Sequence, residues 1–384
     1  MNNSIVYFDN AATTKPHAAA VEAALSCATE AWFNPSAAYN EAVRVREELE
    51  KARATIASLI GARKGKLIFT SGGTEAAYLA VLGYAAALRP NMRYSFVTTA
   101  YEHPAVYNAF RRLEHRGYTV RYVYPDRFGR ISPSDVAAAM DRYTALVSVM
   151  HVNNEYGSIN DIAAIANAVK RVNPAAVFFS DGVQALGRVA AQMHNIDIYG
   201  VSAHKIQGFK GVGALYMGRD LRIDGIPGGG QEGNLRSGTE NMPGILAFEA
   251  AASALNEDAG AIGRMMAVKQ RLYELVSSGI DGVHINGPDI SEGAPHILNM
   301  SIDGVIGETL MHSLEEVGIL TSTGSACSSH RKDARIPASI GLSKGRAASA
   351  VRYSFSPCST IQEAEWAAEQ IIEKAAQLRR FIRR

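Results

Sequence analysis

The first two thirds of the chain alternate short apolar runs with longer stretches of helical periodicity. The apolar runs have the length of buried strands and fall at 67–70, 94–99, 118–124, 145–152, 176–181, 196–202 and 213–217. The helical stretches fall at 16–31, 38–60, 73–88, 104–116, 133–141 and 160–172. This alternation predicts an α/β fold with a mostly parallel, doubly wound seven-stranded sheet that helices cover on both faces.

The pattern changes after about residue 240, where long helical stretches over 243–278 replace the alternation. Shorter strand-like and helical segments follow at 297–302, 306–317, 318–321, 350–355 and 360–380. We predict a large α/β domain over 15–254. A smaller α+β domain is predicted for 255–384 together with 1–14, whose strand-like run is expected to join it.

The composition is that of a soluble globular protein, with 47% hydrophobic and 20% charged residues. A net charge of +2 gives no general case for a nucleic acid or a membrane surface as partner. The start lacks the features of a signal peptide, and the longest apolar run, 76–88, is too short to cross a bilayer. The three cysteines, Cys27, Cys327 and Cys358, are too few and too far apart for a disulfide framework or a zinc cluster. We therefore expect a cytoplasmic protein with reduced thiols and no bound metal.

Polar residues follow the predicted strands at the edge where sheets of this kind bind ligands. Gly73 and Thr74 open a helix directly after the first of these strands, so their amides and hydroxyl suit a phosphate. A glycine turn with a capping threonine is an equally good reading. His103 and Asn154 follow two further strands, where a helix-capping histidine and a turn-forming asparagine are the ordinary alternatives.

Two further strand ends carry the strongest signals. Asp181 closes a very apolar strand, with Gln184 three residues on. A carboxylate held there needs a partner, which a cationic ring nitrogen or a nearby helix start could provide. Ser202, His204 and Lys205 follow the next strand. A partly desolvated lysine loses its proton readily, as a Schiff-base lysine must, although an isolated turn lysine at a sheet edge is common.

Together these strand ends match the chemical handles of pyridoxal phosphate (PLP), namely its phosphate, ring, ring nitrogen and aldehyde. A dinucleotide enzyme would instead need Gly-x-Gly-x-x-Gly after the first strand and an acidic residue about 20 positions later. The sequence lacks that arrangement, so PLP is the better fit.

Nine short segments, in this order and spacing, resemble the PLP-dependent cysteine desulfurases of the NifS type over nearly the whole chain. They are YFDNAATT at 7–14, FTSGGTE at 69–75, EH at 102–103, MHVNNE at 150–155, Asp181 with Gln184, SAHK at 202–205, GGGQE at 228–232, RSGTEN at 236–241 and GSAC at 324–327. Each is weak alone, and their combination is specific. The resemblance implies the PLP-dependent aspartate-aminotransferase-like fold.

The resemblance also implies roles for individual residues. Lys205 would hold PLP as a Schiff base and later move the Cα proton, and His103 would stack on the ring and assist proton transfer. Asp181 would pair with the ring nitrogen, while Gln184 and Asn154 would address the ring hydroxyl. The phosphate would be held by Gly73, Thr74, Ser202, His204 and, from a second subunit, Thr239, which implies a homodimer with shared active sites.

Arg352 interrupts a strand whose residues 351, 353 and 355 are apolar, so its side chain is predicted to face the opposite way. In the resembling family this arginine clamps the α-carboxylate of the substrate, with the asparagine matched by Asn34 nearby. The guanidinium fork suits that task. Without the resemblance, a solvent-facing strand position would be the preferred interpretation.

Cys327 lies in a Gly/Ser-rich loop followed by His330, Arg331 and Lys332, which could favour its thiolate. The resemblance implies that this thiolate attacks the sulfur of L-cysteine, giving L-alanine and a persulfide on Cys327. The sulfur would pass to an acceptor protein, such as an iron–sulfur scaffold. We expect Cys27 and Cys358 to be structural.

Three alternatives stay open. Two are a selenocysteine lyase and another PLP-dependent aminotransferase or lyase of the same fold. The third is a non-catalytic relative that serves as a binding partner. Residues 330–337 also lack the Glu-Pro-Ser usual in the resembling family, and 233–235 replace its frequent Arg-Gly pair.

Overall fold

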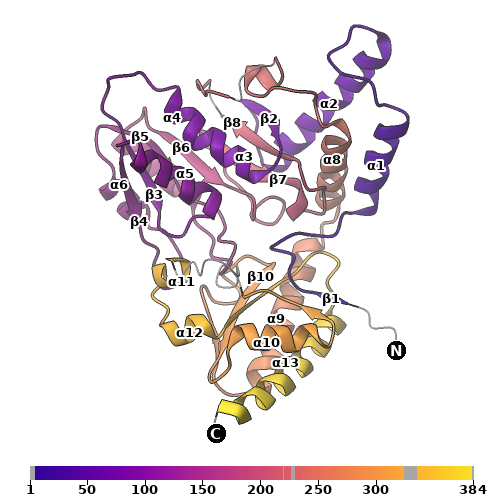
Figure 1. Cartoon of the computed structure of the whole chain (residues 1–384). Helices are drawn as coiled ribbons and strands as arrows, with labels where there is room; N and C mark the ends of the chain where they lie inside the picture. The colour runs from indigo at the N-terminus through magenta and orange to yellow at the C-terminus, as the bar shows by residue number, and fades with distance from the viewer. Residues whose placement is uncertain (1–4, 219, 226–229, 324–334, 383–384) are drawn as a thin grey trace.

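A seven-stranded sheet forms the centre of the larger part of the molecule (Figure 1). The computed structural model describes residues 5–218, 220–225, 230–323 and 335–382. In spatial order the strands are β2 (Lys66–Thr70), β8 (Gly213–Met217), β7 (Ile198–Ser202), β6 (Val177–Asp181), β5 (Thr144–Ser148), β3 (Ser95–Thr99) and β4 (Thr119–Val123). The five strands from β7 to β4 are parallel, and β8 runs antiparallel to both of its neighbours. The predicted mostly parallel α/β sheet is confirmed.

Helices cover both faces of this sheet because each central strand is apolar on both sides. Phe178 packs with the cluster that contains residues of α2 and α7, and its neighbour Phe179 packs with the cluster that contains residues of α3 and α5. The covering helices are α1 (Ala18–Thr29), α2 (Asn40–Leu59), α3 (Gly73–Tyr78), α4 (Tyr84–Ala86), α5 (Pro104–His115), α6 (Pro133–Ala139), α7 (Ile162–Val172) and α8 (Met242–Glu257). A π-helical turn over Leu79–Gly83 makes α3 and α4 one continuous segment.

A smaller part of the molecule lies below the main sheet in Figure 1 and has its own apolar core. Its antiparallel sheet has the order β12 (Ala350–Ser354), β10 (Ile297–Ile302) and β9 (Val283–Ile285). The helices of this region are α9 (Ala261–Gly279), α10 (Gly307–Glu315), α11 (Arg335–Ser339), α12 (Lys344–Ala348) and α13 (Ile361–Ile382).

The N-terminal strand β1 (Val6–Tyr7) pairs in parallel with β11 (Ile319–Leu320), and Val6 and Phe8 pack into the core of this smaller part. Residues 6–8 therefore pack with this smaller part, whereas the assignment of 1–14 to a smaller domain stays a prediction. The domain boundaries at 14 and 255 stay a prediction.

Three details differ from the sequence-based expectations. The predicted helical stretches over 243–278 are two helices, and the break between them, at Asp258–Gly260, was not placed from the sequence. The N-terminal strand is only two residues long, since the chain turns at 9–12. The elements β9, α11 and α12 were not predicted, because each is five residues or shorter and carries little periodicity. Within the described ranges, no helix combines the length and hydropathy needed to span a membrane.

Candidate active site

Lys205 lies in a short 3-10 turn, Ala203–Lys205, that directly follows β7. Its Nζ donates hydrogen bonds to the carbonyl oxygens of Ala11 (2.7 Å) and Ala12 (2.6 Å). Burial, with the charges of Arg352 and Arg188, lowers the pKa of Lys205 to about 8. Its amine therefore becomes neutral at a much lower pH than a surface lysine. This is the property that a Schiff-base lysine requires.

Asp181 ends β6 and is buried. Its Oδ1 accepts a hydrogen bond from the Val183 amide (2.9 Å), and among the described residues it belongs to no ion pair. Burial raises the pKa of Asp181 to about 6, against the opposing effects of that amide and of Lys205. Position 182, directly after Asp181, must be glycine, because a Cβ on Gly182 would lie 2.0 Å from the ring of Tyr199. A buried carboxylate with a single amide donor would gain from a cationic partner.

His103 caps the first turn of α5, with its Nδ1 accepting a hydrogen bond from the Ala105 amide (3.2 Å). The cap places the ring proton of neutral His103 on Nε2. Desolvation, together with the charges of Lys205 and Arg335, lowers the pKa of His103 to about 4, although the side chain has an exposed side. The capping alternative is therefore correct, and it is compatible with a catalytic role because it fixes the tautomer.

Gln184 and Asn154 differ in how fully their amides are bonded. Gln184 is buried, donates from Nε2 to the Ala11 carbonyl (2.9 Å) and accepts at Oε1 from His296 Nε2 (3.1 Å). Asn154 donates to Glu155 Oε1 (2.8 Å), but its buried Oδ1 has no hydrogen-bond partner among the described residues. That unpartnered oxygen can accept a hydrogen bond from a ligand.

The glycine turn that precedes α3 packs tightly against the end of β6. A Cβ on Gly73 would lie 2.7 Å from Val183 Cγ2, and one on Gly72 would lie 3.9 Å from Ser202 Oγ. Gly72 has a φ of 146°, which disfavours other residues there. The turn thus brings its backbone close to the buried Ser202, and Thr74 is exposed beside it.

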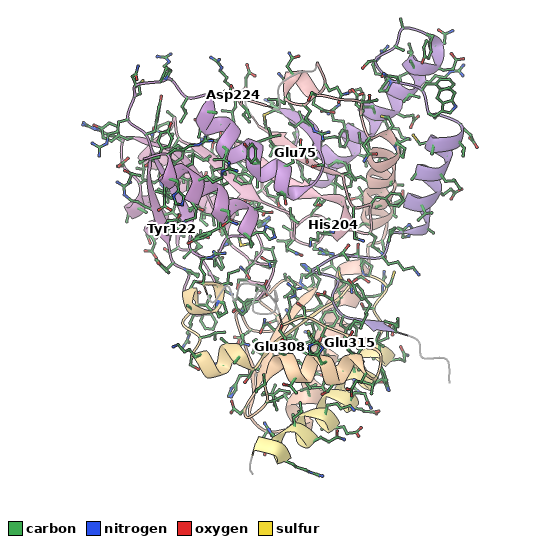
Figure 2. All side chains as sticks on the ribbon, in the orientation of Figure 1. Glu75, Tyr122, His204, Asp224, Glu308 and Glu315 are labelled. Carbon is green, nitrogen blue, oxygen red and sulfur yellow. The ribbon has the colours of Figure 1, made fainter. Side chains whose placement is uncertain are left out.

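His204 and the segment that carries Thr239 border the same region. His204 Nδ1 lies 3.2 Å from Thr13 Oγ1, and burial and the charge of Lys205 lower its pKa to about 4. Figure 2 shows His204 on the side of the main sheet that faces the smaller sheet, and Glu75 at α3 above it. Arg236 Nε binds Glu75 Oε1 (2.6 Å), so the exposed Thr239 belongs to a segment tied to α3.

Arg352 is buried, with 6% of its side chain exposed, so a solvent-facing strand position is excluded. Its Nη2 binds Asp9 Oδ1 (2.8 Å), and its Nη1 binds the Asn154 carbonyl (2.9 Å) and lies 3.7 Å from Glu155 Oε1. The side chains of Val351, Tyr353 and Phe355 face the opposite core, as the alternation predicts. Asn34 is exposed and accepts from the Ser36 amide (2.9 Å) rather than from Arg352, and its substrate-binding role stays a prediction.

The cysteines occupy three different settings. Cys327 and the cationic residues 330–332 lie outside the described residues. Cys27 is buried, in agreement with a structural role. Cys358 is exposed, 3.4 Å from Gln207 Nε2, so it does not belong to a core.

Three residues that lie beside the predicted site residues were not singled out from the sequence. Arg188 is buried, donates to the Lys205 carbonyl and has its pKa lowered to about 10 by burial. Glu102, which precedes His103, is buried, and Arg335 donates to the Glu102 carbonyl (3.0 Å). Glu102 adjoins His103 in a matched segment, and Arg188 follows Gln184 by about one helical turn, so the spacing alone could have drawn attention to both. Arg335 is brought to the site by the fold, and no sequence signal marks it.

Known proteins share both the sequence and the architecture. Residues 6–366 match the family model described as Aminotransferase class-V. A NifS/IcsS protein homolog from Lactobacillus delbrueckii subsp. bulgaricus is 38% identical over 367 residues, which cover 94% of each chain. A cysteine desulfurase IscS from Clostridium botulinum is 36% identical and aligns with 98% of this chain and 96% of its own. A solved NifS-like protein superposes with a TM-score of 0.90 at 30% identity, covering 97% of this chain and all of that one. The chain therefore belongs to the class V aminotransferases and, among them, to the NifS-type cysteine desulfurase family.

Proposed function

We propose that the protein is a PLP-dependent cysteine desulfurase that converts L-cysteine to L-alanine and retains the sulfur as a persulfide on Cys327. Family membership supports the reaction. The observation that carries the proposal is Lys205, whose amine has a lowered pKa and lies at a strand end near the buried Asp181 and Arg352.

The residues at these strand ends fit PLP in three respects. Lys205 can lose its proton near neutral pH, Asp181 is a buried carboxylate without an ionic partner among the described residues, and Asn154 carries an unpartnered buried oxygen. We assign Asp181 to the ring nitrogen, His103 to the ring face, and Gln184 and Asn154 to the ring hydroxyl. The phosphate is assigned to Gly73, Thr74, Ser202 and His204, with Thr239 of a second subunit. Bound there, PLP supplies the electron sink for bond breaking at the substrate Cα.

Protein side chains bind the substrate, move the proton and attack the sulfur. Arg352 binds the substrate α-carboxylate, with Asn34 assigned nearby. Lys205 moves the Cα proton, and His103, neutral with its proton on Nε2, assists the transfer. The Cys327 thiolate attacks the substrate sulfur, so an S–S bond forms, the Cβ–S bond breaks and its electron pair stays with carbon, which protonation converts to alanine.

We further propose a homodimer. Val21, Leu25 and Trp32 are 48%, 63% and 68% exposed on and just after α1. An apolar surface of this kind favours a protein partner. The sulfur acceptor is proposed to be a separate protein, with an iron–sulfur scaffold as the candidate, and the compartment to be the cytoplasm, where thiols stay reduced.

The test combines absorbance spectra with product analysis. The purified protein should show the visible band of a PLP Schiff base, and Lys205→Ala should lose it. With L-cysteine it should form equal amounts of alanine and sulfide under reducing conditions. Cys327→Ser should keep the band and lose sulfide release, and full-rate release by that variant would overturn the proposal. Keto-acid formation, or a preference for selenocysteine, would identify the alternative PLP enzymes, and the absence of any band would favour a binding partner.

A further inference from the structure

His296 precedes β10 and is fully buried, although the mechanism above does not use it. Its backbone carbonyl accepts from the Phe355 amide (2.9 Å), which anchors it to the smaller sheet. Its ring reaches across to Gln184, which follows β6 in the larger part, with His296 Nε2 3.1 Å from Gln184 Oε1. This contact therefore joins the smaller sheet to the proposed PLP site.

The hydrogen bonds around Gln184 determine which way its amide points. The Ala11 carbonyl can only accept, so the Gln184 atom 2.9 Å away must be the amide nitrogen. Gln184 Oε1 then faces His296, whose Nε2 must carry a proton to donate to it. The other ring nitrogen, Nδ1, has no partner among the described residues. The arrangement thus requires neutral His296 with its proton on Nε2.

The surroundings of His296 keep the ring neutral. Burial lowers the pKa of His296 well below its ordinary value, and the charges that add to this effect all come from cations. They lie on the segment after β6, on α9, on β12 and at the end of β7, namely Arg188, Lys269, Arg352 and Lys205. A second proton on Nδ1 would add a charge to this cluster, so His296 remains a donor with a single proton.

The geometry points to His296 as a positioning residue for the cofactor, because its Nε2–H holds the Gln184 amide with the NH2 group toward the ring-hydroxyl side. This inference rests on the proposed function, since Gln184 is assigned to PLP there. The Ala11 carbonyl accepts from both Gln184 Nε2 and Lys205 Nζ, so the orientation of the amide also affects the bonding of the lysine. A flipped amide would place two oxygens against each other at Ala11, and His296 disfavours that flip by donating to Oε1.

The expected signature is spectroscopic. An N–H donor near the ring oxygen stabilises negative charge there and weakens the hold of that oxygen on the neighbouring Schiff-base proton. Loss of the donor should therefore raise the pH midpoint of the visible band of bound PLP. Loss of one hydrogen bond to a charged group corresponds to about one pH unit.

The test uses the holoenzyme and its variants at these two positions. His296→Phe, which keeps a ring but has no donor, should raise the midpoint as Gln184→Leu does, and the double variant should show no further shift. His296→Gln, which keeps a terminal N–H, should restore most of the normal midpoint. A His296→Phe midpoint equal to that of the unmodified enzyme, or fully additive shifts, would overturn the inference.

An NMR measurement on the unmodified holoenzyme tests the tautomer of His296 even if His296→Phe does not fold. Nitrogen-15 NMR of the histidine rings should show His296 as the Nε2–H tautomer, without titration down to about pH 5, well below the ordinary histidine pKa. An Nδ1–H tautomer or a protonated ring would contradict the inference. An unmodified protein without PLP, or without alanine formation, would instead contradict the proposed function.

Discussion

Arg352 and Asp9 are joined by an ion pair of 2.8 Å between Nη2 and Oδ1, which links β12 to the segment that follows β1. In the role proposed for Arg352, a substrate carboxylate would need the Nη2 position that the Asp9 carboxylate occupies. Arg352 Nη1 is bonded to the Asn154 carbonyl, and Nε is buried. The proposed role of Arg352 therefore predicts that Asp9 competes with the substrate for the guanidinium.

Asp9→Asn should lower the KM for L-cysteine by about fivefold with kcat unchanged. The amide oxygen can still accept from Nη2, while the competing negative charge is lost, and a neutral acceptor binds about half as strongly as a charged one. Steady-state kinetics of alanine formation measure the change. Arg352→Lys is the matched control and should reduce kcat/KM by about 10- to 100-fold, because it loses the fork. A raised KM in Asp9→Asn would mean that Asp9 orients Arg352 rather than competing.

Uptake of PLP by the cofactor-free protein should depend on pH through Lys205. The pKa of about 8 lies below the ordinary lysine value of 10.5, so the reactive neutral amine increases as the pH rises toward 8. The rate of appearance of the Schiff-base band should rise about tenfold per pH unit below 8 and level off above it. Arg188→Met removes one of the cations that depress this pKa and should move the midpoint upward. A midpoint near that of a surface lysine would contradict the prediction.

Asp181→Asn should reduce kcat for alanine formation by about 100-fold or more, because the neutral amide cannot stabilise a positive ring nitrogen. The visible band of bound PLP should also change, which separates this effect from loss of substrate binding. Asp161→Asn serves as the control. Asp161 caps α7 by accepting from the Ala164 amide (2.9 Å), and asparagine caps equally well. Equal activities in the two variants would exclude the assigned role of Asp181.

Glu102 should make the stability of the cofactor-free protein fall as the pH rises. Its Oε1 accepts from Thr99 Oγ1 (2.9 Å) and the Met150 amide (2.8 Å), whereas its buried Oε2 has no partner among the described residues. Burial and the charge of Asp181 raise its pKa from 4.5 to about 8. Between these two values the unfolded chain loses the proton that the folded protein retains, so the stability contributed by Glu102 is lost through this window.

Urea denaturation of the wild type and of Glu102→Gln at several pH values measures this effect. The unfolding free energy of the wild type should fall by a few kcal/mol relative to that of Glu102→Gln between about pH 5 and 8, and the difference should then level off. The variant serves as the reference because its amide does not titrate. A difference that stays constant with pH would show that Glu102 is ionised in the folded protein.

The sequence alone predicted the positions of residues whose surroundings are determined by their neighbours in the chain. Asp181 is the last residue of an apolar strand and Lys205 follows another by three positions, so the burial of each is determined by the strand beside it. The seven strands of the main sheet were predicted to within a few residues for the same reason, since strand length and apolar character are local properties.

Relationships between distant segments could not be predicted. Asp9 and Arg352 are 343 positions apart and His296 and Gln184 are 112 apart, and no periodicity links such pairs. A buried guanidinium needs acceptors, and those of Arg352 come from Asp9 and Asn154, which the β12 pattern does not reveal. The position of the break at 258–260 was not assigned because a local helical pattern continues on both sides of it.

Residues 9–14 are hydrogen-bonded to other segments near both of their ends, which links the hydrogen exchange of their amides. The Asn10 amide donates to the Ser354 carbonyl (3.3 Å), and the Thr14 amide donates to the His204 carbonyl (2.9 Å). Between them, the carbonyl oxygens of Ala11 and Ala12 accept hydrogen bonds from Lys205 Nζ. The amides of Asn10 and Thr14 should therefore show one common opening free energy in hydrogen exchange, that of the opening that also uncovers Lys205. Exchange at Asn10 and Thr14 thus reports on the accessibility of Lys205.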